Sequence, residues 1–403
     1  MEIARPPPPP PTAAAVAVAA AMFSVLGNDD LLREILLRLG LPTSLLRAAL
    51  VCKRWYRHAS DPDFLRRFRD RNPPRILGVY LNALGGGCPR FFPIRPLPEL
   101  AATAHRPGSF FDAVAGSTAF IVDSGGGRLL VTAIYDGHGY YESSHLLCSP
   151  LSSAGNAVVV PPPPRRPPVE LPGIGPEHLT LCTSLPDGRS WLCVLMGFRD
   201  QQTTVWLYEL QEMCWVARAS AAAQLPESPT FCMAELFDDS KFYSLITGNK
   251  ILVCDFPSST ISAMELPNGV ESDDDYHSIM LSRRDGSGIY LIHVKESLLR
   301  VFHNDDAGNW FLVQSICLRE VYANLGMADW PPLCGVKIRA VGDNAKFVFL
   351  DMFGTIVFLD ATSKQAEKVY EVAPDDVVTT VHPLMLIWPP VFPQLKEGYH
   401  QQD

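Results

Sequence analysis

Residues that could carry out chemistry are few in this chain of 403 residues, and none has a spacing typical of an enzyme. Three consecutive acids, Asp273 to Asp275, stand just before His277 and are the strongest candidate for a metal site. Consecutive side chains in a strand or turn do not converge on one ion, so the favoured interpretation is a solvated loop. His138 lies between two glycines, which is typical of a turn residue.

Known catalytic motifs are also missing from the sequence. The glycine-rich segments at residues 85–87 and 125–127 lack the lysine and the strand–turn–helix context of a phosphate-binding loop, which favours hairpin tips. The chain contains neither Gly-x-Ser-x-Gly nor His-Glu-x-x-His, the signatures of a hydrolase and of a zinc protease. We therefore expect no catalytic residue, no metal site and no cofactor.

The ten cysteines and the N-terminal segment bear on the compartment. No Cys-x-x-Cys occurs, and most cysteines stand in apolar runs such as residues 192–195, where cysteine behaves as a small buried hydrophobic residue. An Ala/Val run at residues 13–22 follows six prolines, an order that does not fit a secretory signal. That run is also shorter than the ~20 residues needed to cross a bilayer. We expect free thiols, no membrane partner, and an intracellular protein of the nucleus, the cytoplasm or both.

Composition and charge divide the chain into two parts. Its 36 prolines favour many short strands and turns over an all-helical fold. Residues 26–75 contain 11 Lys and Arg against 6 Asp and Glu, a local charge of +5, whereas residues 76–403 contain 22 against 36, a charge of −14. The net charge of −9 argues against nucleic acid as a partner of the whole chain. A basic part followed by an acidic part indicates two surfaces with different partners.

Residues 23–72 have the apolar spacing of short helices. The first is predicted to begin after Asn28, a suitable N-cap, and to end at Gly40. A second follows the possible caps Thr43 and Ser44, a third contains Trp55, and a fourth has proline at its first position, Pro62. In the second segment, burial is predicted for Leu45, Leu46, Ala49 and Leu50. Four short helices bury little surface, so they must pack against the rest of the chain or against a partner.

This helical part carries a resemblance to a known family. Residues 26–36 (LGNDDLLREIL), 44–47 (SLLR) and 51–55 (VCKRW) resemble an F-box, and residues 60–65 (SDPDFL) resemble its usual end. One departure is Gly27, which stands where the family commonly has proline. Because proline would stiffen the segment before the first helix, glycine is expected to loosen docking slightly.

The resemblance implies docking on a Skp-family adaptor, which connects F-box proteins to a cullin scaffold and a ubiquitin-charged conjugating enzyme. A basic rim around apolar side chains would suit an acidic, apolar groove, because charge speeds the encounter and buried apolar groups supply affinity. The adaptor-binding residues that the resemblance implies are Leu26, Leu31, Leu32, Ile35, Leu36, Leu45, Leu46, Val51, Cys52 and Trp55. For each of them the alternative is plain packing in the core of the helical part.

Downstream of residue 75 the pattern changes to strands. Hairpins are predicted at residues 129–148, 191–208, 242–254, 289–302 and 347–359. The second strand of each unit contains Leu147, Trp206, Leu252, Leu299 or Ile356, and these residues are 59, 46, 47 and 57 positions apart. Units of three or four strands at this spacing indicate a β-propeller. A sixth unit would combine residues 76–81 with residues 377–387 and close the ring. A β-sandwich is the alternative.

The fold class we predict is α+β and multidomain. Residues 1–22 would be a disordered Pro/Ala-rich tail, residues 23–72 an F-box domain, and residues 73–403 a β-propeller-like substrate-binding domain. This order also resembles plant-type F-box proteins with an associated propeller domain. The proline-rich residues 161–168 are expected to be a loop between two units, and a proline-rich docking peptide is the alternative.

The predicted function is that of a non-catalytic substrate receptor in an SCF-type (Skp–cullin–F-box) ubiquitin ligase, with a protein substrate of unknown identity. The acidic body has only two adjacent basic pairs, at residues 165–166 and 283–284, which favours a basic or apolar recognition segment in that substrate. The alternatives are an adaptor-bound scaffold outside the ligase and a propeller enzyme. The enzyme would need convergent polar residues on the propeller axis.

Overall fold

The structure is a computed structural model, and it divides the chain into two compact units. It describes residues 22, 24–72, 75–84, 87–94, 111, 118–137, 140–151, 157–165, 178–184, 190–199, 202–225, 231–238, 240–246, 249–271, 277–305, 308–327, 330–331, 335–373, 376–386 and 392. One unit, which we call the head, comprises Met1–Arg75 and Ile387–Asp403. The other unit, the body, comprises Ile76–Leu386.

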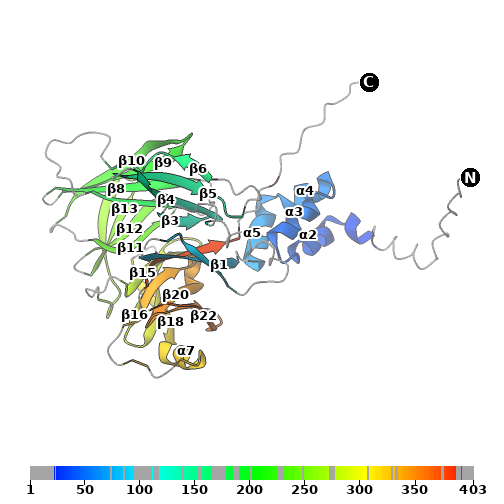
Figure 1. The fold of residues 1–403 in the computed structure, drawn as a ribbon. Coiled ribbons are helices and arrows are strands. Elements are labelled where there is room, and N and C mark those ends of the chain that lie inside the picture. Colours follow the sequence, from blue (N-terminus) through cyan, green and yellow to red (C-terminus); the bar gives the residue numbers. More distant parts are fainter. Residues whose placement is uncertain are drawn as a thin grey trace, which may run out of the picture. The chain divides into compact units, whose positions relative to one another are not determined.

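The head contains short helices, as predicted. They are α2 (Asp29–Leu37), α3 (Pro42–Ala49), α4 (Lys53–Ala59) and α5 (Pro62–Arg71) (Figure 1). The Asn28 side chain caps α2 by accepting from the N–H groups of Asp30 and Leu31 at 2.9 and 3.1 Å. The Asp61 side chain caps α5 by accepting from Phe64 N–H at 2.9 Å. Thr43 and Ser44 are not caps, because α3 begins at Pro42 with Leu41 as its N-cap, and the missing N–H of proline costs nothing at that first position.

A small apolar core holds these helices together. Phe64 and Phe68 of α5 stack on one another with ring centroids 6.2 Å apart. Tyr56 of α4 makes an edge contact with Phe392, whose centroid lies 5.7 Å away. The fully packed members of this core are Leu32, Leu36, Leu37, Leu45, Ala49, Ala59, Phe64 and Phe68. A core of this size stabilises a domain only marginally by itself.

The described strands of the body form six antiparallel sheets, five with four strands and one with three (Figure 1). The first four-stranded sheet contains β3 (Thr118–Gly125), β4 (Arg128–Gly137), β5 (Tyr140–Cys148) and β6 (Ala157–Val160), and the second contains β7 (His178–Ser184), β8 (Trp191–Arg199), β9 (Gln202–Gln211) and β10 (Cys214–Gln224). The third contains β11 (Phe231–Asp238), β12 (Lys241–Ile246), β13 (Lys250–Asp255) and β14 (Thr260–Glu265), and the fourth contains β15 (Ile279–Arg283), β16 (Ile289–Lys295), β17 (Leu298–Asn304) and β18 (Trp310–Cys317). The fifth contains β19 (Lys337–Val341), β20 (Phe347–Met352), β21 (Thr355–Asp360) and β22 (Ala366–Glu371). The three-stranded sheet has the order β2 (Arg90–Pro93), β1 (Ile76–Leu84), β23 (Val377–Met385).

These sheets are the blades of a six-bladed β-propeller. Each pair of neighbouring sheets encloses its own apolar cluster, including the pair formed by the last sheet and the first. The first strand of one sheet also contacts the first strand of the next, as β15 contacts β11 and β19. A ring in which every sheet packs on two neighbours leaves only the outer strands as edges. The propeller prediction is therefore confirmed, and the β-sandwich alternative is not favoured.

The sequence pattern located the hairpins but misnumbered their strands. The five marker residues, Leu147, Trp206, Leu252, Leu299 and Ile356, all lie in the third strand of their blade. The predicted hairpins therefore join the second and third strands, and each first strand was missed. Two of the first strands are short, β15 and β19 with five residues each, whereas β3, β7 and β11 have seven or eight. A short helix, α7 (Leu318–Asn324), and the single-turn η3 (Asp343–Ala345) were also not predicted.

The ring closes where the two ends of the body pair, as predicted for the sixth unit. β1 pairs with β23 antiparallel, with Tyr80 opposite His382. Asn82 of β1 reaches into the first blade, where its side chain accepts from Ile121 N–H at 3.0 Å and donates to Ile121 C=O at 2.8 Å. The same amide nitrogen lies 2.6 Å from Thr380 Oγ1, which lies 2.9 Å from His382 Nε2. One buried side chain thus bonds β3 to the joined ends of the ring.

Several smaller predictions can be compared with the structure. Gly126 and Gly127 form the tip of the β3–β4 hairpin with φ of 57° and 73°, a conformation that favours glycine. Cys148, Cys182, Cys193 and Cys254 are buried, whereas Cys52 and Cys214 are exposed, and these six are free thiols. The acidic run at residues 273–275 and His138 lie outside the described residues. None of the described helices is long and apolar enough to span a membrane.

Candidate protein-interaction surface

The head presents apolar side chains to solvent at positions where the resemblance implied a binding role. Leu31 and Ile35 are 46% and 37% exposed and lie one turn apart on α2. Val51, in the turn between α3 and α4, is 65% exposed, and the N-cap of α4, Cys52, is also exposed. Exposing apolar side chains costs free energy in water, and contiguous exposed apolar surface is typical of interaction sites.

The other implied residues are covered by the head itself. Leu32, Leu36 and Leu45 have no exposed surface and belong to the apolar core. Leu26 and Trp55 are half-buried and pack against that core, and Leu46 is half-buried. The ten implied residues therefore fall into a surface group, a partly covered group and a core group.

Helix geometry explains why adjacent residues have opposite roles. Residues one turn apart lie on the same side of a helix, whereas adjacent residues lie about 100° apart around it. Leu32 and Leu36 of α2 therefore face the core, and Leu31 and Ile35 are displaced from that face. Whether Leu31 and Ile35 bind the adaptor stays a prediction.

Two further exposed residues extend this apolar surface and were not among those implied. Leu50 is 68% exposed, so the prediction of its burial with Leu45 and Ala49 is wrong. Leu45 and Ala49 are four residues apart and share the buried side of α3, whereas Leu50 follows Ala49 directly and caps the helix end. Val25, 40% exposed, precedes α2. In the sequence, the signal for its exposure was an apolar residue only three positions before the capping Asn28.

Arg54 fixes the segment that leads into α2. Its guanidinium donates to the C=O groups of Leu26 at 2.7 Å and Gly27 at 2.8 Å, and to Asp29 Oδ1 at 2.6 Å. Asp29 Oδ1 also lies 3.0 Å from His58 Nε2. The hydrogen bonds from Arg54 and then from His58 hold the pKa of Asp29 below its ordinary value. α4 therefore braces the start of α2 where the family commonly has a proline.

Cationic residues flank this surface. Lys53 and Arg57 on α4 are exposed. Arg66 and Arg67 on α5 form exposed ion pairs with Asp63 and Glu34, which contribute little stability. An apolar patch with a net basic surround fits a partner whose groove is apolar and acidic.

The architecture agrees with the comparison to known families. Residues 29–71 match the family described as F-box-like. Residues 120–392, well over half of the chain, match the family described as "F-box protein AT5G49610-like, beta-propeller". The two matches define an F-box protein whose second domain is a propeller. The chain belongs to the AT5G49610-like family of F-box proteins, which agrees with the plant-type resemblance seen in the sequence. An F-box-like domain implies binding to a Skp-type adaptor in general.

Similarity to solved structures is weak. Prolyl oligopeptidase B from Galerina marginata is 11% identical with a TM-score of 0.32, and the match covers 62% of this chain and 33% of that one. This chain thus spans about a third of the oligopeptidase. The Cps50 (Swd1) β-propeller domain from Myceliophteria thermophila is 10% identical with a TM-score of 0.34, covering 65% and 91%. Similarity at such low TM-scores gives no information about function. No curated protein sequence matches the chain.

Proposed function

We propose that this protein is the substrate-receptor subunit of an SCF-type ubiquitin ligase. The head docks on a Skp-family adaptor, which joins it to a cullin, and the body binds a protein substrate. The observation that carries the proposal is the exposed apolar surface of Val25, Leu31, Ile35, Leu50, Val51 and Cys52 in a domain that matches the F-box-like family. Docking would remove this surface from water and supply affinity.

The receptor acts by proximity and performs no catalysis of its own. Holding a substrate on the body places its lysines near the ubiquitin-charged conjugating enzyme at a high effective concentration. We found no grouping of three or more His, Cys, Asp or Glu side chains able to hold a metal among the described residues. The proposal includes neither a nucleic-acid nor a membrane partner, and it places the protein in the nucleus, the cytoplasm or both.

Co-purification with a Skp-family adaptor tests the docking surface. We expect wild type to retain the adaptor, and Leu31→Asp and Val51→Asp each to weaken binding about 100-fold, as at interface hot spots. Both residues are exposed, so a carboxylate there leaves the core of the head intact. Leu312→Asp on β18 of the body is the matched control, because Leu312 is an exposed leucine outside the head and its replacement leaves adaptor binding unchanged.

Reconstitution with adaptor and cullin separates the ligase from the scaffold alternative. The proposal expects a stable three-protein complex that ubiquitinates a captured substrate when the remaining ligase subunits are added. Adaptor binding without cullin association would assign the protein to a scaffold outside the ligase. Adaptor binding that survives both head substitutions would contradict the docking surface itself.

A further inference from the structure

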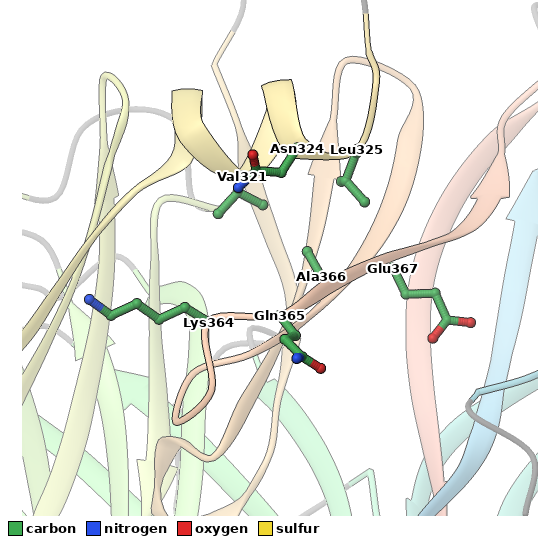
Figure 2. A pocket seen from close by; sticks show the side chains of 7 residues that line it. All are labelled: Val321, Asn324, Leu325, Lys364, Gln365, Ala366 and Glu367. Atoms are coloured by element: carbon green, nitrogen blue, oxygen red, sulfur yellow. The ribbon is translucent and has the colours of Figure 1, made fainter.

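A hollow of about 400 Å³ lies between α7 and the start of β22. Figure 2 shows Val321 and Asn324 of α7 and the following Leu325 on one side of the hollow and Ala366 on the other, with Ala366 pointing towards the helix. Lys364, Gln365 and Glu367 complete the lining. This volume lies at the lower end of the range for pockets that hold small ligands, and it is large enough for an apolar side chain.

The main chain of β22 forms one wall of this hollow. β22 is the outer strand of its blade, and among the described strands it pairs with β21 alone. The C=O of Gln365 accepts from Asp360 N–H at 2.9 Å, and Ala366 is the next residue, opposite Leu359. In an antiparallel ladder, successive residues direct their N–H and C=O groups alternately towards the partner strand and away from it. The N–H and C=O of Ala366 therefore point away from β21, towards the open edge.

The side chain of Ala366 determines which way an added strand would face. Ala366 packs against the apolar cluster that contains Leu318, Val321 and Tyr322 of α7. In a strand paired with β22, the residue opposite Ala366 would direct its side chain to the same face of the sheet. That side chain would enter the hollow beside Val321 and Leu325.

We propose that this edge is the substrate-docking site of the body and that its ligand is an extended peptide segment. The peptide adds antiparallel to β22, exchanges two main-chain hydrogen bonds with Ala366, and places a Leu-, Ile- or Met-sized side chain in the hollow. This inference rests on the proposed function, since it names the segment class that the receptor takes. The apolar central residue of this peptide agrees with the apolar recognition segment, which is one of the two kinds, basic or apolar, expected from the charge of the body.

Lys364 adds a preference at the flank of the peptide. Its backbone φ of 57° places it in the turn that precedes β22, and it lines the hollow together with Glu367. An acidic residue in the flank of the peptide would pair with its ammonium. This contribution is small because exposed ion pairs are worth little, so replacing Lys364 with Glu would weaken peptides with an acidic flank about threefold.

A peptide pull-down on the full chain tests the proposal. The probe is a pool of nonapeptides with Leu, Ile, Met, Ser or Lys at the fifth position and Ser, Thr or Asp elsewhere, identified by mass spectrometry. We expect wild type to retain peptides with a central Leu, Ile or Met. Asn324→Trp, which fills the hollow from an exposed position, is expected to lower retention at least about tenfold, the loss of one good contact. Ala323→Trp is the matched control, because Ala323 is exposed on the same helix and does not line the hollow.

A second probe tests the strand pairing. Methylating the main-chain nitrogen of the central residue removes the N–H that donates to Ala366 C=O and leaves the side chain unchanged, so retention should fall by a similar factor. The proposal is overturned if wild type retains no peptide of the pool, if Asn324→Trp retains as much as Ala323→Trp, or if N-methylation has no effect. Adaptor retention measured on the same samples shows separately whether the proposed function fails.

Discussion

The head and the body treat their apolar residues differently. In the body, each blade covers the faces of its neighbours, and six apolar clusters fill the six seams of the ring. In the head, eight residues form the core, while Leu31, Leu50 and Val51 remain in water although they lie beside it in the sequence. The facing surfaces of the blades are therefore covered within the ring, although the outer strand β18 exposes Phe311, Leu312 and Val313. The head gains stability from a partner, which is the physical mark of a docking module.

The strongest test of this comparison uses two adjacent leucines of the head. Leu32 has no exposed surface, so Leu32→Asp places a carboxylate in the core and should cost at least about 4 kcal/mol, enough to unfold the head. Leu31→Asp places the same charge in solvent and should leave the head folded. Limited proteolysis of the full chain, with cleavage sites mapped by mass spectrometry, measures this difference. Equal protection of the head in both variants would contradict the division into surface and core.

Closure of the ring provides the corresponding test for the body. Asn82→Ala leaves the N–H and C=O of Ile121 buried without their partner, at about 1–3 kcal/mol for each group, so we expect a loss of about 3 kcal/mol. Urea unfolding followed by Trp fluorescence measures the loss, because Trp191 is buried in the body. Asn309→Ala is the control, since Asn309 is exposed and its side chain bonds only locally to Asp305. A similar loss for both variants would show that Asn82 has no special role in closure.

Sequence patterns predicted the helices and strands of both units better than they predicted the burial and contacts of individual side chains. The second and third strands of each four-stranded blade, the cap Asn28 and the start of α5 at Pro62 follow from short-range signals, whereas the pairing of β1 with β23 was inferred from closure of the ring. The exposure of Leu31 and the burial of the adjacent Leu32 do not follow from such signals, because apolar spacing defines a helix face without showing what covers it. Arg54 was missed for the same reason, as its acceptors lie 25 to 28 residues away in the chain.

A buried histidine and a half-buried glutamate of the body should respond to acid in opposite ways. Burial lowers the pKa of His382 to about 4, and its Nε2 lies 3.2 Å from the amide nitrogen of Asn82, which is a donor, so the neutral form fits the site. Between about pH 6.5 and 4 the unfolded chain binds the additional proton, and stability falls with pH by at most about 3 kcal/mol. Burial raises the pKa of Glu235 to about 7, so the folded chain binds that proton first and gains stability as pH falls from about 7 towards 4.5.

Single substitutions separate these two effects. Glu235→Gln should make the body lose stability more steeply on acidification than wild type does. His382→Gln should make the same curve flatter or reverse its slope. The midpoint of urea unfolding measured at pH 7.0, 6.0 and 5.0 provides the comparison. His145, whose pKa burial also lowers, is present in both variants and cancels between them. Identical slopes in the two variants would refute the assignment of opposite signs.

The smallest expected effect concerns the brace formed by Arg54. Arg54→Ala frees the C=O groups of Leu26 and Gly27, so Leu26 and the start of α2 lose their fixed position on the docking surface. Two charge-assisted bonds at a partly exposed site contribute about 1 kcal/mol after solvent competition, which corresponds to a loss of adaptor affinity of about fivefold to tenfold. Arg57→Ala, one turn further along the same helix, removes the same charge without disturbing the brace. If adaptor binding is measured by calorimetry at two salt concentrations, Arg57→Ala should weaken it only at low salt, whereas the effect of Arg54→Ala should persist at high salt. An equal and salt-dependent loss in both variants would mean that Arg54 acts through its charge alone.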